Sequence, residues 1–107
     1  MTPYAVVLVT ASTADEAGRI ARALVEERLA ACANIVPQIR SLFHWEGKLC
    51  DEAESLIVLK ARAADVEAIV TRVRALHSYT VPEVIALPIL EGSPPYLAWL
   101  EESTQRS

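Results

Sequence analysis

Residues 32–48 read Cys-Ala-Asn-Ile-Val-Pro-Gln-Ile-Arg-Ser-Leu-Phe-His-Trp-Glu-Gly-Lys, an extended run with one proline that closes in a turn at Glu46-Gly47. Residues 48–62 form a second extended run of similar length. A two-residue loop with glycine in second place is typical of a tight β-hairpin, because glycine accepts the positive φ that such turns require. The pattern therefore predicts one long β-hairpin, which is a major part of a chain of 107 residues.

The turn also predicts the register of this hairpin. A two-residue loop pairs Trp45 with Lys48, and the same register carried along both strands places Cys32 opposite Ala61. Pro37 has no backbone N–H to donate, so it indicates an edge position or a bulge. A bulge at that point would shift the register by one residue.

The segment before the hairpin predicts a strand and a helix. Residues 4–10 are continuously apolar and rich in β-branched side chains, as expected of a strand covered on both faces. Thr13 and Glu16 have the spacing of a capping box, so the helix is expected to begin there. The helix should end near residues 29–31, and its apolar stripe consists of Ala17, Ile20, Ala21, Leu24 and Val25.

A second amphipathic helix follows the hairpin. Asp65 is its predicted N-terminal cap. The polar connector at residues 77–82 ends this helix, because Pro82 prevents helical continuation. The apolar stripe repeats at helical spacing and consists of Val66, Ile69, Val70, Val73 and Leu76.

The C-terminal part predicts a last strand and a short helix. Residues 83–89 are nearly all apolar and form the strand. Pro94 or Pro95 suits the first turn of a closing helix. Tyr96 and Trp99 are expected to clamp that helix onto the core.

The order β-α-β-β-α-β predicts an α+β, ferredoxin-like fold, with an antiparallel four-stranded sheet and two helices on one face. In such a fold the other face should alternate toward polar residues. Instead, residues 6–9, 56–59 and 84–87 are apolar at consecutive positions. We therefore expect a homo-oligomer whose sheets pack together, with the hairpin reaching a neighbouring copy.

Composition narrows the class of protein. The length suits a single domain spanning residues 1–107, and 52% of its residues are hydrophobic. The net charge of −4 disfavours a nucleic-acid or anionic-membrane partner. No apolar run approaches a membrane span, and the first residues lack the basic segment of a signal peptide. With two cysteines and no disulfide framework, we expect a cytoplasmic protein.

Five segments, in this order, resemble the CutA family of divalent-cation tolerance proteins; they are residues 28–37, 45–48, 77–83, 86–89 and 96–99. The resemblance covers nearly the whole chain. It implies a homotrimer, similar in architecture to the PII signalling proteins. It also implies a role in the response to metal ions, with copper binding reported for the family and no established enzymatic reaction.

The resemblance also implies candidate metal ligands. The family's copper site uses a thiol in the first strand and two histidines, and Val9 and Leu76 stand at two of these positions. His77 is the retained position, so we predict a site shared between subunits that uses His77, with Cys32 as a weaker candidate. Cys32 also suits a small buried apolar position, and His77 suits a cation at the C-terminal end of a helix.

A second hypothesis is a PII-like regulatory module that holds a small ligand in a cleft between subunits. Tyr79 and Glu83 lie between helix and strand, where a cleft could form, and Lys48 and Lys60 could pair with Glu83. We therefore predict a ligand cleft of Tyr79, Glu83, Lys48 and Lys60. The predicted interface residues are Trp45, Phe43 and Pro37 of the hairpin, since an exposed tryptophan is costly.

Catalysis has little support. Glycine occurs only at positions 18, 47 and 92, so no phosphate-binding loop is present, and no Ser-His-Asp or Cys-His spacing is found. An acylphosphatase-like activity rests on analogy of fold alone. The acidic residues Asp51, Glu52 and Glu54 are interpreted as a solvated edge of the hairpin. We expect a binding protein with no required cofactor, not an enzyme.

Overall fold

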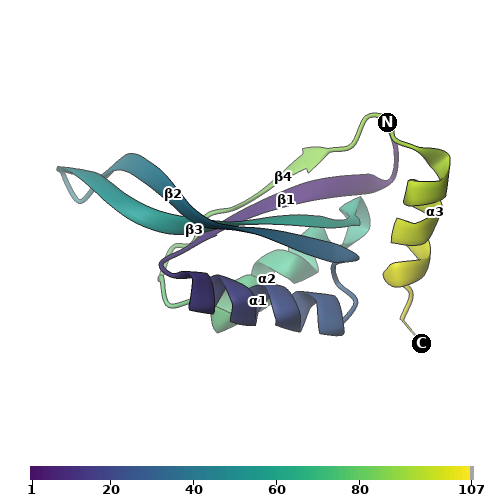
Figure 1. The fold of residues 1–107 in the computed structure, drawn as a ribbon, viewed down its shortest axis with the longest axis horizontal. Coiled ribbons are helices and arrows are strands. Elements are labelled where there is room, and N and C mark those ends of the chain that lie inside the picture. Colours follow the sequence, from purple (N-terminus) through teal and green to yellow (C-terminus); the bar gives the residue numbers. More distant parts are fainter. Residues whose placement is uncertain (107) are drawn as a thin grey trace.

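The computed structural model describes residues 1–106 and has the predicted β-α-β-β-α-β order with a closing helix (Figure 1). Its sheet is antiparallel, with strand order β2-β3-β1-β4, as the ferredoxin-like prediction requires. Within residues 1–106, no helix is long and apolar enough to cross a bilayer. The elements are β1 (Tyr4–Ala11), α1 (Ala14–Glu26), β2 (Cys32–Trp45), β3 (Lys48–Arg62), a 3-10 turn (Ala63–Asp65), α2 (Val66–Leu76), β4 (Val84–Pro88) and α3 (Pro94–Ser103).

Helices α1 and α2 cover one face of the sheet, and α3 stands at the end of the sheet away from the hairpin tip (Figure 1). The core forms where alternate strand residues meet the apolar helix stripes, because the strand period of two points every second side chain toward the helices. Its fully buried side chains include Val7, Val9, Ile57 and Leu59 from the strands and Ile20, Leu24, Ile69 and Val73 from the helices.

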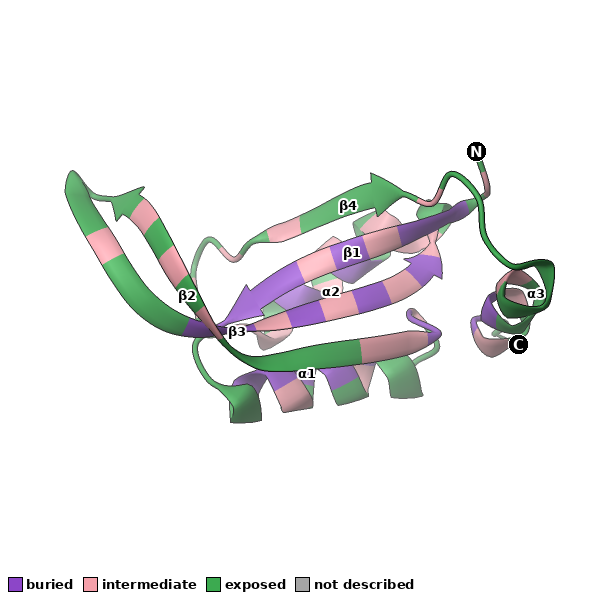
Figure 2. Cartoon of the chain, turned by 45° about the horizontal axis from the view of Figure 1, so that its top comes forward, coloured by how far each residue is buried: buried purple, intermediate pink, exposed green. Residues whose placement is uncertain are grey.

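The other face of the sheet is also apolar, which confirms the expectation from the sequence. The register places Leu8 opposite Ile85 and Val6 opposite Leu87 on this face. Ile85 is 52% exposed and Leu87 is 48% exposed, and β4 is mostly exposed along its length (Figure 2). We call this surface the open face; it consists of Val6, Leu8, Val36, Leu56, Val58, Ile85 and Leu87.

The hairpin turn confirms the sequence interpretation at its tip and corrects it further in. Glu46 and Gly47 both have positive φ, 51° and 78°, and Trp45 pairs with Lys48. A bulge between Val36 and Ile39 shifts the register by one.

The predicted pairing of Cys32 with Ala61 is therefore wrong, and Cys32 pairs with Lys60. Pro37 explains the bulge, because a residue without an N–H interrupts the ladder. The Ser55 hydroxyl donates to the Pro37 carbonyl at 2.6 Å, which satisfies an acceptor that the ladder has lost. Beyond this bend, the hairpin projects from the body of the subunit (Figure 1), whose extents are 44 × 26 × 22 Å.

Helix α1 begins as predicted but ends earlier. The Thr13 side chain accepts a hydrogen bond from the Glu16 N–H at 3.1 Å. The helix stops at Glu26 instead of residues 29–31, because Arg28 adopts φ 60° and turns the chain. The N–H groups of Arg28 and Leu29 bond to the carbonyls of Val25 and Leu24, the pattern of a Schellman C-cap.

The closing helix is held differently from the prediction. Leu100 is fully buried beside Tyr4 and Ala31, whereas Tyr96 and Trp99 are 42% and 41% exposed. The two aromatic rings lie 5.4 Å apart and pack on each other. Leu100 points into the body because it lies on the side of α3 that faces Tyr4, so Tyr96 and Trp99 are not the clamp.

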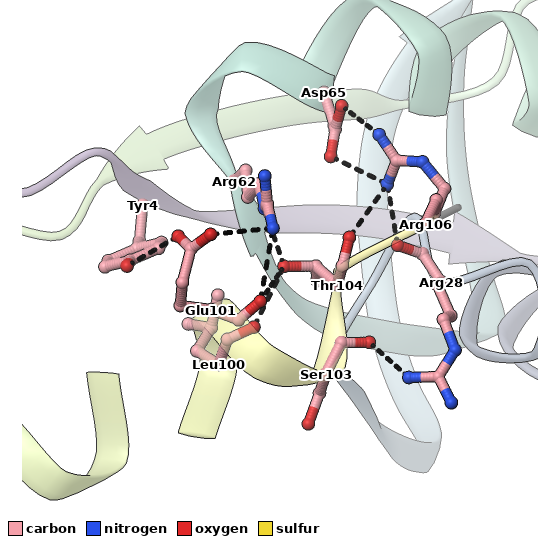
Figure 3. A network of polar contacts seen from close by, with 9 residues as sticks. All are labelled: Tyr4, Arg28, Arg62, Asp65, Leu100, Glu101, Ser103, Thr104 and Arg106. Carbon is pink, nitrogen blue, oxygen red and sulfur yellow. Dashed lines mark hydrogen bonds and ion pairs between the residues drawn. The ribbon is translucent and has the colours of Figure 1, made fainter. Parts of the chain in front are cut away.

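Polar contacts fasten the two ends of the chain around this helix (Figure 3). Arg62 forms an ion pair with Glu101 at 2.7 Å, and Glu101 accepts a hydrogen bond from the Tyr4 hydroxyl at 2.9 Å. Arg106 pairs with Asp65 at 2.9 Å and donates to the Arg28 carbonyl. Asp65 is the N-cap residue of α2, as predicted, but its side chain binds Arg106 and makes no capping hydrogen bond to the helix.

Candidate functional site

A cleft of about 830 Å³ opens between the outer half of the hairpin and the connector, residues 77–83. We call it the hairpin cleft. Its walls are residues 40–45, 50, 52 and 54 of the hairpin and residues 79–83 of the connector, with Thr10 from β1. The cleft exists because the bend at the β2 bulge and the path from α2 to β4 leave space between them.

A hydrogen bond between Tyr79 and Glu54 joins the two walls of the cleft. The Tyr79 hydroxyl donates to Glu54 Oε2 at 2.8 Å, and Glu54 is only 8% exposed. Burial raises the pKa of Tyr79, and the Glu54 carboxylate raises it further, because a phenolate would face a second negative charge. Tyr79 therefore remains a neutral donor to a buried carboxylate.

His77 anchors the start of the connector to the sheet. Its ring lies 2.7 Å from the Thr10 carbonyl oxygen through Nε2. Its Nδ1 accepts a hydrogen bond from the Tyr79 N–H at 3.0 Å. The side chain is fully buried, and its ring centroid lies 4.6 Å from that of Tyr79.

Glu16 anchors the same segment to α1. Its carboxylate accepts hydrogen bonds from the Ser12 N–H and hydroxyl at 3.1 and 2.9 Å, and from the Ser78 N–H at 2.8 Å. Burial is the largest single influence and raises the pKa of Glu16, but the bonds from Ser78 and Ser12 together outweigh it. The pKa falls to about 2, so a buried, ionised carboxylate fastens the connector to the N-terminus of α1.

The predicted ligand cleft is only half assembled in one chain. Tyr79 and Glu83 line the hairpin cleft, whereas Lys48 and Lys60 do not. Lys48 lies at the hairpin turn, and Lys60 hydrogen-bonds to Asn34 at the far end of β3. Among residues 1–106, Glu83 forms no ion pair with either lysine.

The predicted interface residues lie along the projecting hairpin. Phe43 and Trp45 line the cleft, and Trp45 is partly exposed in one chain. Pro37 is exposed at the bulge of the edge strand. All three are therefore placed where a second copy could reach them, and their contact with one stays a prediction.

The two predicted metal ligands lie in different parts of the subunit. His77 bonds to Thr10, which pairs with Leu56, whereas Cys32 pairs with Lys60, four residues further along β3. The Cys32 thiol lies 3.7 Å from the Tyr96 hydroxyl. Within residues 1–106, no three His, Cys, Asp or Glu side chains gather as a metal-binding group.

Sequence interpretation missed the roles of Glu16 and Glu54. Glu16 was expected to complete a capping box, but its carboxylate bonds to Ser12 and Ser78 and not to the N-cap amide. Glu54 was interpreted as part of a solvated edge, but it is buried against Tyr79. One signal was available for Glu54: it is in phase with Leu56 and Val58, which face the open side of β3.

Comparison with known proteins gives a consistent result. Residues 5–103 match the protein family described as CutA1 divalent ion tolerance protein. The chain is 50% identical over 99 residues to the divalent-cation tolerance protein CutA of Thermus thermophilus, covering 92% of this chain and 96% of that protein. It is 45% identical over 97 residues to human protein CutA, covering 91% of this chain but 54% of that longer protein.

Solved structures agree with the sequence matches. The structure of CutA1 from Oryza sativa superposes with a TM-score of 0.94 at 46% identity, covering 99% of this chain and 97% of that one. The divalent cation tolerance protein from Thermus thermophilus gives a TM-score of 0.92 at 48% identity, covering 95% and 99%. The likeness therefore extends over the whole fold, including the long hairpin.

Proposed function

Because this chain belongs to the CutA1 divalent ion tolerance protein family, we propose that it acts in divalent-cation tolerance as a homotrimer, by binding and not by catalysis. The observation that carries this proposal is the open face. Half-exposed Ile85 and Leu87 pair with Leu8 and Val6 of the neighbouring strand, on a sheet whose helices cover the opposite side. Burial of this apolar area between copies of the chain stabilises the assembly, because the area is removed from water.

The two free edges of the sheet support a closed ring of copies. β2 forms one edge and β4 the other, and they differ in length and sequence. A contact between two different surfaces is heterologous, and such contacts close into rings when the rotation permits. Three copies is the number that the family resemblance of the sequence implies.

We propose that copper-type divalent cations are the ligand and that their site is shared between copies. Cys32 supports this placement, because it begins the edge strand β2 and lies half-buried beside the aromatic pair of α3. A thiolate is a good ligand for copper-type cations. We propose no nucleic-acid or membrane partner for this acidic chain. We also propose that it acts in the cytoplasm.

Calorimetric titration of Cu²⁺ into the assembled protein tests this proposal. We expect saturable heat with a fixed number of ions per trimer, a marked loss of affinity in Cys32→Ser, and loss of binding in a monomeric variant. Cys50→Ser is the matched control, since Cys50 lies in the outer hairpin and should leave the affinity unchanged. Absence of saturable heat with wild type, or equal binding by the monomer, would contradict the proposal.

The PII-like alternative is not favoured. The hairpin cleft contains Tyr79 and Glu83, but the two lysines that would attract an anionic ligand lie elsewhere in the chain. The cleft instead presents the carboxylates of Glu52 and Glu83. We therefore favour the cation-tolerance proposal over an anion-sensing module.

A further inference from the structure

Both ring nitrogens of His77 have hydrogen-bond partners of opposite kinds. Nε2 faces the Thr10 carbonyl oxygen, which can only accept, so this nitrogen carries the hydrogen. Nδ1 faces the Tyr79 N–H, which can only donate, so this nitrogen presents its lone pair. The two partners together select the ring tautomer that is protonated at Nε2, and the nearest charged group is Glu16, whose Oε2 lies 3.9 Å from Nδ1.

This arrangement conflicts with a ligand role for His77. A neutral imidazole binds a metal through a nitrogen lone pair, and the single lone pair here points at the Tyr79 N–H. Coordination would require loss of that bond and exposure of a fully buried ring. It would also leave the partly buried Tyr79 N–H without its acceptor, which is unfavourable.

The contacts point instead to a positioning role. The Tyr79 N–H donates to the side chain of His77, two residues earlier, as in an Asx-turn. In such a turn a side chain replaces a backbone acceptor. The same histidine fastens this turn to β1 through Thr10. This turn also sets the direction of the Tyr79 side chain, whose hydroxyl donates to Glu54 across the cleft.

We infer that His77 is a positioning residue of the hairpin cleft and not a metal ligand. It holds Tyr79 in place by bridging β1 and the connector, while Glu16 holds the adjacent Ser78 N–H. The inference does not depend on the number of subunits or on the proposed cation.

Two conservative variants separate the two bonds of His77. Asparagine places Oδ1 where Nδ1 stands and is a preferred residue for Asx-turns, so His77→Asn should preserve the bond from the Tyr79 N–H. Glutamine places a donor near the Nε2 position, so His77→Gln should preserve only the bond to Thr10. His77→Ala removes both bonds.

Amide hydrogen exchange at Tyr79 distinguishes these variants in the assembled protein. We expect exchange at least about tenfold faster than wild type in His77→Gln and His77→Ala, which corresponds to about 1.4 kcal/mol, and near wild type in His77→Asn. Equal exchange in wild type and His77→Ala would overturn the positioning role. If the His77 side chain only filled space, the Tyr79 amide would exchange as fast in His77→Asn as in His77→Gln. That result would also overturn the positioning role.

Nitrogen NMR of the imidazole tests the other half of the inference. His44→Gln leaves His77 as the one remaining histidine, so its ring signals are assigned without ambiguity. We expect the pattern of a neutral ring protonated at Nε2, unchanged by one equivalent of Zn²⁺. A coordination shift of either ring nitrogen, or loss of Cu²⁺ affinity in His77→Asn, would overturn the inference.

If wild type bound no Cu²⁺, the proposed function would fail, while the Tyr79 exchange rates would still decide the role of His77.

Discussion

Replacement of both Ile85 and Leu87 by glutamate is expected to convert the assembled protein into monomers. The two side chains are half-exposed in one chain and project from β4 onto the open face. In a trimer the double substitution would bury six additional carboxylates in an apolar interface, and an unpaired buried charge costs several kcal/mol. Light scattering after size-exclusion chromatography should give a mass near the 11.7 kDa of one chain.

The substitution Val25→Glu provides the control for this prediction. Val25 is also partly exposed and apolar, but it lies on α1, in the helical layer on the other side of the sheet. Its replacement adds the same charge outside the proposed interface, so the assembled mass should persist. Circular dichroism should show folded protein for both variants. An unchanged mass for the Ile85→Glu, Leu87→Glu variant would contradict the role of the open face.

Removal of the Glu16 side chain is expected to cause the second large effect. Glu16→Ala leaves the Ser12 and Ser78 N–H groups without their buried acceptor, so the free energy of unfolding should fall by about 3 kcal/mol. Glu27→Ala, at the C-cap of the same helix, is the matched control. Glu27 also accepts three hydrogen bonds, from Arg72, but both side chains are exposed, so its loss should cost less than about 1 kcal/mol. Chemical denaturation at one fixed protomer concentration measures both changes, and equal losses would contradict the account.

The same carboxylate predicts a pH dependence of stability. The pKa of Glu16 is about 2 in the folded chain and about 4.5 as an ordinary glutamate, so folding favours the ionised form. Its contribution to stability is complete above pH 4.5 and is lost as the pH falls toward 2. Wild type should therefore lose more stability than Glu16→Gln across this window, and parallel curves for the two proteins would refute the assignment.

Periodic patterns predicted the elements of the fold well, because each pattern is local. The apolar alternation of the strands and the helical stripes of α1 and α2 each depend on residues within a few positions of one another. The boundaries were less predictable. Arg28 ends α1 in a left-handed conformation that favours glycine. Because the residue there is arginine, the sequence does not indicate this conformation. Pro37 indicated a bulge or an edge, but the choice between these changes the partner of Cys32.

The hydrogen bonds that hold the connector, residues 77–83, were not predictable in the same way, because they join distant parts of the chain. Glu16 and Ser78 are separated by 62 positions, and Glu54 and Tyr79 by 25. The phase that Glu54 shares with Leu56 and Val58 is also that of the exposed Glu52, so this signal does not single out Glu54. Only the fold, by bringing the connector across the base of the hairpin, makes that carboxylate a buried acceptor.

In the proposed trimer, copies of this chain cover the apolar side of the sheet that its own helices leave bare. Sedimentation equilibrium of the wild-type protein at micromolar concentration tests this most directly. We predict a single species of three times the 11.7 kDa chain mass. A stable, folded species of one chain mass at that concentration would contradict it.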